Sequence, residues 1–248
     1  MEWKLENNRY EVIERHNGDC VVKDKMENTF YFQKKYYISQ KYEFEKKERI
    51  CWNWKDNLTL VGIVLSLISM IIVFGQKNKI FALNTNITNV EYIQSVLFIV
   101  FNILLHEMAH YWMMRFYGRQ AGKIKLKFYL RIFPCLIINT SDSYMLPRYR
   151  RGFVYYAGIM INWIICGIVL IFWPTYSFLL RSIVWMNIYN MIPFGGIKTD
   201  GYHIIVNTVL DIRELKGKKN LISEITKYVF IFFEIISFYW SAIIMLDK

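Results

Sequence analysis

Residues 106–110 of the chain, His106-Glu107-Met108-Ala109-His110, lie within an apolar run over residues 92–117 that is long enough to form one helix. Two histidines four positions apart are separated by about 400° of helical rotation, so they project from one face, one turn apart. This spacing lets two imidazole nitrogens reach one Zn²⁺, with Glu107 beside them to accept a proton from the attacking water. The alternative is that these polar side chains only satisfy one another inside a helix bundle.

Four further apolar runs accompany this one, and together they indicate a membrane protein. The five runs cover residues 58–75, 92–117, 152–173, 177–194 and 221–246. Each has at least 18 residues, and 18 residues make a helix of about 27 Å, close to the roughly 30 Å hydrocarbon core of a bilayer. We therefore expect an all-α polytopic protein with about five transmembrane helices, in a domain over residues 58–248. At membrane depth two histidines and a glutamate are costly, which favours a functional site.

The charge of the chain supports the same interpretation. Its 248 residues include 31 Lys and Arg against 20 Asp and Glu, a formal net charge of +11, and 54% of them are hydrophobic. Residues 118–151 alone hold eight Lys and Arg and one Asp. A nucleic-acid-binding protein would carry its basic residues on a soluble fold, so we expect no nucleic acid and a lipid bilayer as partner. By the positive-inside rule this loop and the N-terminus are cytoplasmic.

A catalytic zinc needs a third protein ligand, and the expected topology indicates where to find it. The second and fourth helices run in the same direction, so the ligand should lie at or beyond the end of the fourth. There Pro193, Gly195 and Gly196 break the helix, and Asp200 follows. Irregular backbone at membrane depth is tolerated where it is buried in protein or lines a water-filled cavity. Asp200 is therefore the predicted third ligand, and one Zn²⁺ the predicted cofactor.

Residues 123–132 nearly alternate polar and apolar side chains, a period of two that predicts a strand in a β-hairpin along the membrane surface. Pro134 is expected to break this strand, and residues 136–139 to form the return strand. The strand edge could bind an extended peptide substrate, with Lys125 and Lys127 in contact with it. A solvated basic loop that only orients the helices is an equally weighted alternative.

Residues 1–57 are expected to form a small β-rich segment on the cytoplasmic side. Residues 10–15, 20–24 and 29–33 have the composition of short strands, and Asn17-Gly18 and Glu27-Asn28 that of turns. So short a segment buries little surface, and it is expected to lean on the membrane domain or on a partner.

The cysteines and the position of the first apolar run bear on the cellular compartment. The cysteines occur singly, as Cys20, Cys51, Cys135 and Cys166, which predicts free thiols in a reducing compartment. The first apolar run begins only at Leu58, so membrane insertion is expected through internal helices and without a cleaved signal peptide.

Taken in order, the motifs resemble the site-2 protease family of intramembrane zinc metalloproteases. The resemblance covers about residues 95–210 and rests on the HEMAH motif over residues 106–110 and on Asn190-x-x-Pro193 followed by Asp200-Gly201. It implies that both histidines and Asp200 hold zinc, that Glu107 is the base, and that Asn190 contacts the substrate. It also implies that a substrate strand adds beside a membrane-surface sheet, here at residues 123–132.

A third motif contributes to the same resemblance. Ala157, Gly158 and Asn162 are similar to an Ala-Gly-x-x-x-Asn motif of the family, although small residues at a helix interface explain them equally well.

Within that family the chain is most similar to small bacterial proteases encoded beside ribosomally made, modified peptides of the bacteriocin or epipeptide type. This similarity lies in residues 133–135, 140–142 and 199–202, while the interval from Asn190 to Asp200 is two residues longer than in the family pattern. It implies an endopeptidase of the bacterial plasma membrane that cleaves a small precursor peptide near the cytoplasmic face. It also implies a peptide-modifying enzyme or an ABC transporter as a further partner, and residues 1–57 as a remnant of a precursor-recognition domain.

Two other functions stay open at this point. One is a non-catalytic immunity or export partner with a structural zinc site, which would not require Glu107. The other is a regulatory protease that releases a membrane-tethered factor. The sequence has no recognisable PDZ-like domain, which argues against this second function. His203, three residues after Asp200, is expected to orient the aspartate, to lie behind the zinc ligands, or to have no role.

Overall fold

The structure is a computed structural model that describes residues 2–15, 19–34, 44, 46–81, 88–129, 133–192 and 199–205. The predicted helix over residues 221–246 lies outside these residues. The chain divides into two compact units, Met1–Leu65 with Glu107–Val154, and Ser66–His106 with Tyr155–Lys248. The division passes through three long continuous helices, so each of these helices contributes residues to both units.

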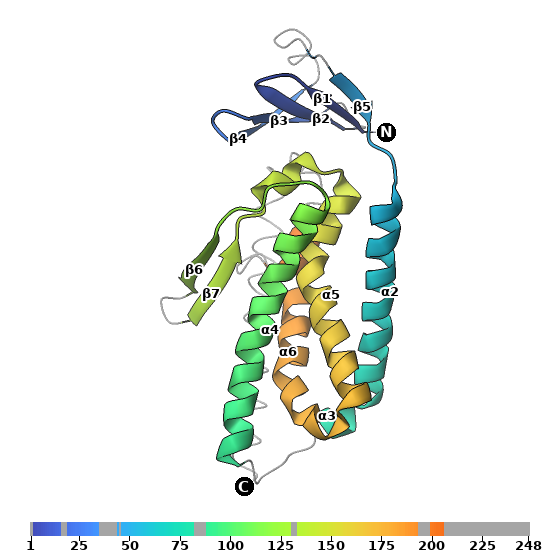
Figure 1. Ribbon diagram of the computed structural model, residues 1–248, viewed down its shortest axis with the longest axis vertical. Helices are drawn as coiled ribbons and strands as arrows, with labels where there is room; N and C mark the ends of the chain where they lie inside the picture. The colour runs from blue at the N-terminus through green and yellow to red at the C-terminus, as the bar shows by residue number, and fades with distance from the viewer. Residues whose placement is uncertain are drawn as a thin grey trace. The chain divides into compact units, whose positions relative to one another are not determined.

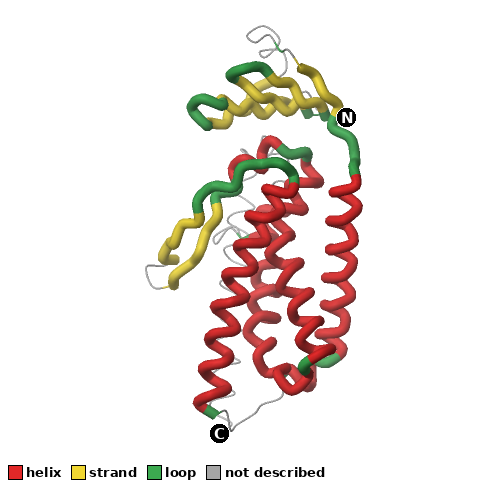
Figure 2. The backbone as a smooth tube through the Cα atoms, viewed as in Figure 1, coloured by secondary structure: helices red, strands yellow, loops and turns green. Residues whose placement is uncertain are grey.

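A five-stranded antiparallel sheet opens the first unit (Figures 1 and 2). Its strands, in the spatial order β4-β3-β2-β1-β5, are β1 Trp3–Glu6, β2 Tyr10–Glu14, β3 Asp19–Asp24, β4 Thr29–Lys34 and β5 Lys46–Arg49. The strands β2, β3 and β4 confirm the three that the sequence predicts. Asn28 has a φ of 52° in the turn before β4, a left-handed conformation that asparagine tolerates. The predicted turn at Asn17-Gly18 lies outside the described residues.

Both faces of this sheet carry buried apolar side chains. Val12, Cys20 and Val22 pack together on one face. On the other face Ile13 and Val21 pack against Met145, which belongs to the 3-10 helix η1, Ser141–Met145. The sheet therefore has its second face covered from within the first unit, as a segment too small for its own core requires.

The basic loop forms the predicted hairpin, in which β6 Ile124–Tyr129 pairs with β7 Phe133–Ile138 (Figure 2). The prediction that Pro134 breaks the strand is wrong, because Pro134 lies within β7, opposite Phe128. Both strands of a two-stranded sheet are edge strands, where proline is tolerated since one side of the ladder is unpaired. Residues 130–132, the expected end of the first strand, lie outside the described residues.

Three described helices are long and apolar enough to cross a membrane, namely α2 Trp54–Gly75, α4 Asn89–Phe116 and α5 Arg148–Phe172. All three begin earlier than the apolar runs that predict them. The helix α5 starts directly after Pro147 and includes Arg148, Arg150 and Arg151, because a helix can begin within a charged segment while hydropathy marks only its apolar part.

The predicted helix over residues 177–194 is divided in the structure. A 3-10 helix, η2 Pro174–Leu179, precedes the α-helix α6 Leu180–Met191 of 12 residues, and Ile192 is extended. Twelve residues span about 18 Å, so among the described residues this run is not a full membrane span.

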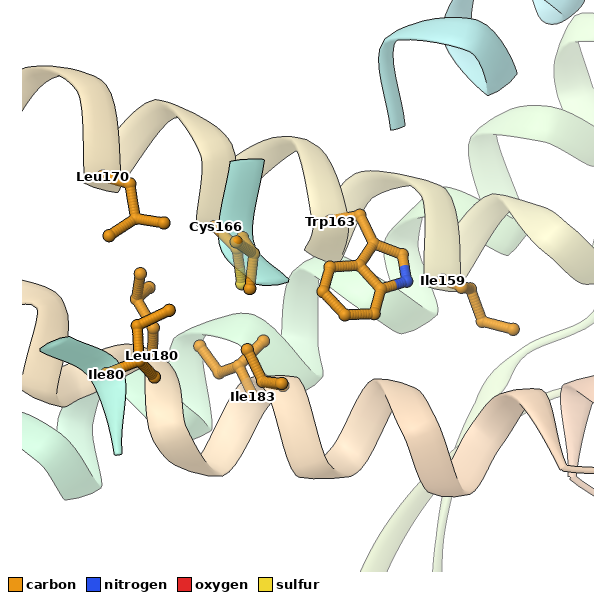
Figure 3. Packing of buried hydrophobic residues seen from close by; sticks show 9 residues of the cluster. Ile80, Ile159, Trp163, Cys166, Leu170, Leu180 and Ile183 are labelled. Carbon is orange, nitrogen blue, oxygen red and sulfur yellow. The ribbon is translucent and has the colours of Figure 1, made fainter. Parts of the chain in front are cut away.

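The core of the second unit lies between α5 and α6, with α3 Lys77–Ile80 at its end (Figure 1). Figure 3 shows Trp163 and Cys166 of α5 directed towards the α6 side chain Ile183. Trp163 is fully buried, and Cys166 is a buried free thiol. Cys20 and Cys51 are free as well, as predicted, whereas the side chain of Cys135 lies outside the described part. This packing fixes α6 against the α5 surface that carries the polar residues described next.

Candidate metal centre

The two histidines of the HEMAH motif lie on the buried face of α4, as their spacing predicts. His106 and His110 expose only 6% and 5% of their surface, whereas Glu107 between them is partly exposed. The two imidazole rings are therefore held inside the protein, while Glu107 is not fully enclosed.

His110 has a fixed orientation and a fixed tautomer. Its Nδ1 lies 2.8 Å from the backbone carbonyl oxygen of Val154. A carbonyl only accepts, so Nδ1 carries the proton and donates, and Nε2 is the nitrogen with the lone pair. Metal-binding histidines commonly have such a partner on the other ring nitrogen.

His106 lies against a small residue and between two polar ones. Its Nε2 is 2.9 Å from Asp200 Oδ2, and its Nδ1 is 3.1 Å from Asn162 Nδ2. A Cβ at Gly158 would lie 2.5 Å from the imidazole ring, so only glycine leaves room for the histidine there. The residues Gly158 and Asn162, which the sequence also allowed as simple packing residues, therefore contact the predicted ligand directly.

Asp200 is the first residue of the short helix α7, Asp200–Ile204, and its neighbours hold it in place. The hydroxyl of Thr199 accepts from the Tyr202 backbone N–H at 3.2 Å and donates to the Ile192 carbonyl at 2.6 Å. Gly201 approaches the end of α6 so closely that a Cβ would collide with the Met191 carbonyl. The Asp200 side chain itself is 16% exposed.

These residues form a group that could bind a metal ion. One ligand atom each of His106, His110 and Asp200 lies within 4.8 Å of the others. Two imidazole nitrogens and one carboxylate oxygen are a donor set of catalytic zinc, which keeps its fourth position for water or substrate. The hydrogen bond on the other ring nitrogen of His110 also suits a bound metal, so the residues present fit zinc.

The remaining predicted site residues are distributed around the described structure. His203 stacks on Tyr155 with ring centroids 4.9 Å apart and an interplanar angle of 13°. Asn190 is half-buried near the end of α6, and Lys125 is exposed on β6. The side chain of Lys127 lies outside the described part of the chain.

One residue of this network has no counterpart among the predicted site residues. Asn187 of α6 is fully buried, and its Oδ1 accepts from Asn162 Nδ2 at 3.1 Å, which links α6 to the His106 ring through one amide. Its position three residues before Asn190 on the same helix is the only signal in the sequence that could have indicated it.

Comparison with known proteins gives one relative of similar length. No protein-family model matches the chain, and no solved structure matches it. Over 214 residues, 82% of each chain, it is 25% identical to a Bacillus subtilis (strain 168) protein named "Putative peptide zinc metalloprotease protein YydH". The chain that brings His106, His110 and Asp200 together is thus similar, over most of its length, to a protein named as a peptide zinc metalloprotease.

Proposed function

We propose that the protein is a membrane-embedded zinc endopeptidase. The observation that carries the proposal is the convergence of two histidines and one aspartate beside a partly exposed glutamate on α4. The similarity to a protein named as a peptide zinc metalloprotease supports the same class of reaction. The three long apolar helices support a location in a membrane, which we propose to be the bacterial plasma membrane.

In this proposal His106, His110 and Asp200 hold one Zn²⁺. When bound, zinc polarises the scissile carbonyl and lowers the pKa of a water molecule in the site. Glu107 accepts the proton of the attacking water and later passes it to the leaving amine. The Val154 carbonyl keeps the proton of His110 on Nδ1, and Thr199 keeps Asp200 at the start of α7.

The substrate is proposed to bind as an extended peptide, because a helix buries the carbonyl that must be attacked. In the described structure β6 pairs with β7 alone, so its other edge has no strand partner there. Lys125 and Leu126 are exposed on β6. An edge of this kind binds an added strand through main-chain hydrogen bonds, and a small precursor peptide would meet that requirement. Asn190 is proposed as a further substrate contact, and a modifying enzyme or a transporter as a partner.

The test is cleavage and zinc content of the purified protein with Glu107→Gln. Cleavage of the co-expressed precursor, followed by mass spectrometry, should fall by about 10²-fold or more because the general base is lost. Zinc should stay at the wild-type level. The matched control is Glu91→Gln on the same helix, since the Glu91 carboxylate accepts hydrogen bonds from Thr88 at the start of α4. Unchanged cleavage with Glu107→Gln would refute the protease and leave a structural zinc site.

A second variant tests the third ligand. Asp200→Ala should lower the zinc content well below that of the wild type, because two histidines alone hold zinc weakly. Equal zinc in both proteins would remove Asp200 from the ligand set.

A further inference from the structure

The two buried amides next to His106 have no role in the proposed reaction so far. Asn162 of α5 and Asn187 of α6 are both fully buried. Asn162 Nδ2 lies 3.1 Å from His106 Nδ1 and 3.1 Å from Asn187 Oδ1, so one amide nitrogen donates to both. Within the described part of the chain, Asn162 Oδ1 and Asn187 Nδ2 are buried and lack a hydrogen-bond partner. A half-turn exchanges the oxygen and the nitrogen of an amide, so this pair of amides has two orientations that differ in whether a donor or an acceptor faces His106.

The tautomer of His106 determines the direction in which these amides point. The Asp200 carboxylate only accepts, so in this arrangement Nε2 of His106 holds the proton and Nδ1 accepts from Asn162. A metal ion bound by Nε2 requires the opposite tautomer, with the proton on Nδ1. His110 already has that tautomer, because a carbonyl faces its Nδ1.

We propose that Asn162 and Asn187 are positioning residues that turn their amides together when zinc binds. After a half-turn of both amides, Asn162 Oδ1 takes the place of Nδ2 and accepts from His106 Nδ1 and from Asn187 Nδ2. Both orientations contain the same hydrogen bonds and the same number of unpartnered atoms, so the proton on His106 decides between them. The inference rests on the proposed zinc function, because it assigns the residues that support one ligand of that site.

Zinc affinity of the full chain in detergent micelles tests this role. Asn162→Leu removes the acceptor for Nδ1 and should weaken zinc binding by about 10–100-fold in competition with a chromogenic chelator. Asn162→Asp has the same shape and always accepts, so its affinity should equal or exceed that of the wild type. Asn187→Leu removes only the outer amide and should have a smaller effect than Asn162→Leu.

The matched control is Asn102→Leu. Asn102 is also fully buried, and it lies on α4, where its Nδ2 donates to the Phe98 carbonyl at 2.8 Å. Its substitution changes buried polarity in the same helix as His106 without touching the Asn162–Asn187 pair. Zinc affinity should therefore stay at the wild-type value.

A spectroscopic readout separates positioning from general stability. In metal-free protein labelled with ¹⁵N-histidine and measured at alkaline pH, His106 of the wild type should hold its proton on Nε2. With Asn162→Asp a proton should be present on His106 Nδ1, because the carboxylate that then faces it only accepts, while His110 keeps its proton on Nδ1 in both proteins. A folding defect would not move one histidine tautomer and leave the other unchanged.

The outcomes distinguish this inference from the proposed function. A wild-type protein that binds no zinc would overturn both. A wild type that binds zinc, together with Asn162→Leu that binds it equally well, would overturn only the positioning role. Equal weakening by Asn162→Leu and Asn162→Asp would overturn it as well, since only the aspartate can accept a hydrogen bond from the Nδ1–H of His106.

Discussion

The two units of the molecule satisfy their buried polar groups by different chemistry. In the first unit, buried acidic side chains are paired with full positive charges, as in Glu11 with Arg119 and Asp142 with Lys23. Among the described residues of the second unit, the fully buried polar side chains are uncharged: Ser66, Asn102, Asn162 and Asn187. The second unit also contains most of the length of the apolar helices, where a charge is most costly. Neutral amides are therefore the polar groups that can be buried at low cost beside His106, the predicted zinc ligand.

Removal of one charge from the first unit should give the largest loss of stability. In Arg119→Leu, Glu11 would stay buried without its two hydrogen bonds of 2.9 and 2.6 Å, and Lys4 at 3.3 Å would offset only part of the loss. The free energy of unfolding should fall by about 3–5 kcal/mol. Urea unfolding in micelles measures it. The double variant Glu11→Leu/Arg119→Leu should recover most of the loss, and equal instability of both variants would contradict the pairing argument.

The second largest effect should come from a methyl group at Gly158 in the second unit, and its cause is a steric clash with no change of charge. With Gly158→Ala the new Cβ would lie 2.5 Å from the His106 ring and push it away from its place. Zinc affinity should fall by about 10–100-fold, as for other changes behind a metal ligand. Gly75→Ala is the control, because a Cβ there meets nothing within 4 Å. Wild-type zinc affinity of Gly158→Ala would show that His106 needs no such space.

Removal of one buried amide should cost less than removal of one buried charge. Asn187→Leu deletes the acceptor for Asn162 Nδ2 and should lower the free energy of unfolding by about 1–3 kcal/mol. The same urea titration serves as the measurement. A loss as large as that of Arg119→Leu would remove the distinction between the two units.

The smallest effect should be a pH dependence confined to the first unit. Hydrogen bonds from Lys25 and Lys4 lower the pKa of Glu6 from 4.5 to about 2. Because the folded-state pKa is depressed, this pair stabilises the protein above about pH 4.5 and is lost as the pH falls towards 2. Glu6→Gln should therefore be less stable than wild type at neutral pH, by about 1 kcal/mol or less, and equally stable near pH 2. A constant difference across this range would contradict the assignment.

Local patterns in the sequence account for the parts of the structure that were predicted. Histidine spacing placed His106 and His110 on one face of α4, alternation identified β6, and strand composition between turn residues identified β2, β3 and β4. The strand β5, Lys-Lys-Glu-Arg, has no alternation, because a charged edge strand needs no apolar face. Neither β5 nor β1 could be found without knowledge of the pairing between them.

The support behind His106 could not be predicted for a similar reason. Asn162 and Asn187 are 25 residues apart and belong to different helices. Their meeting depends on how α5 and α6 pack around Trp163 and Ile183, which no spacing within either helix reveals. Gly158 and Asn162 belong to a motif in the sequence, but their contact with His106 depends on the packing of α5 against α4.

The hydroxyl of Thr199 has a consequence for how this chain can vary. By binding the carbonyl of Ile192 on one side and the N–H of Tyr202 on the other, it ties the residue after α6 to the first turn of α7. Extra residues between two points tied in this way cost only a few tenths of a kcal/mol in entropy. The interval between Asn190 and Asp200 can therefore change while Asp200 keeps its 2.9 Å contact with His106.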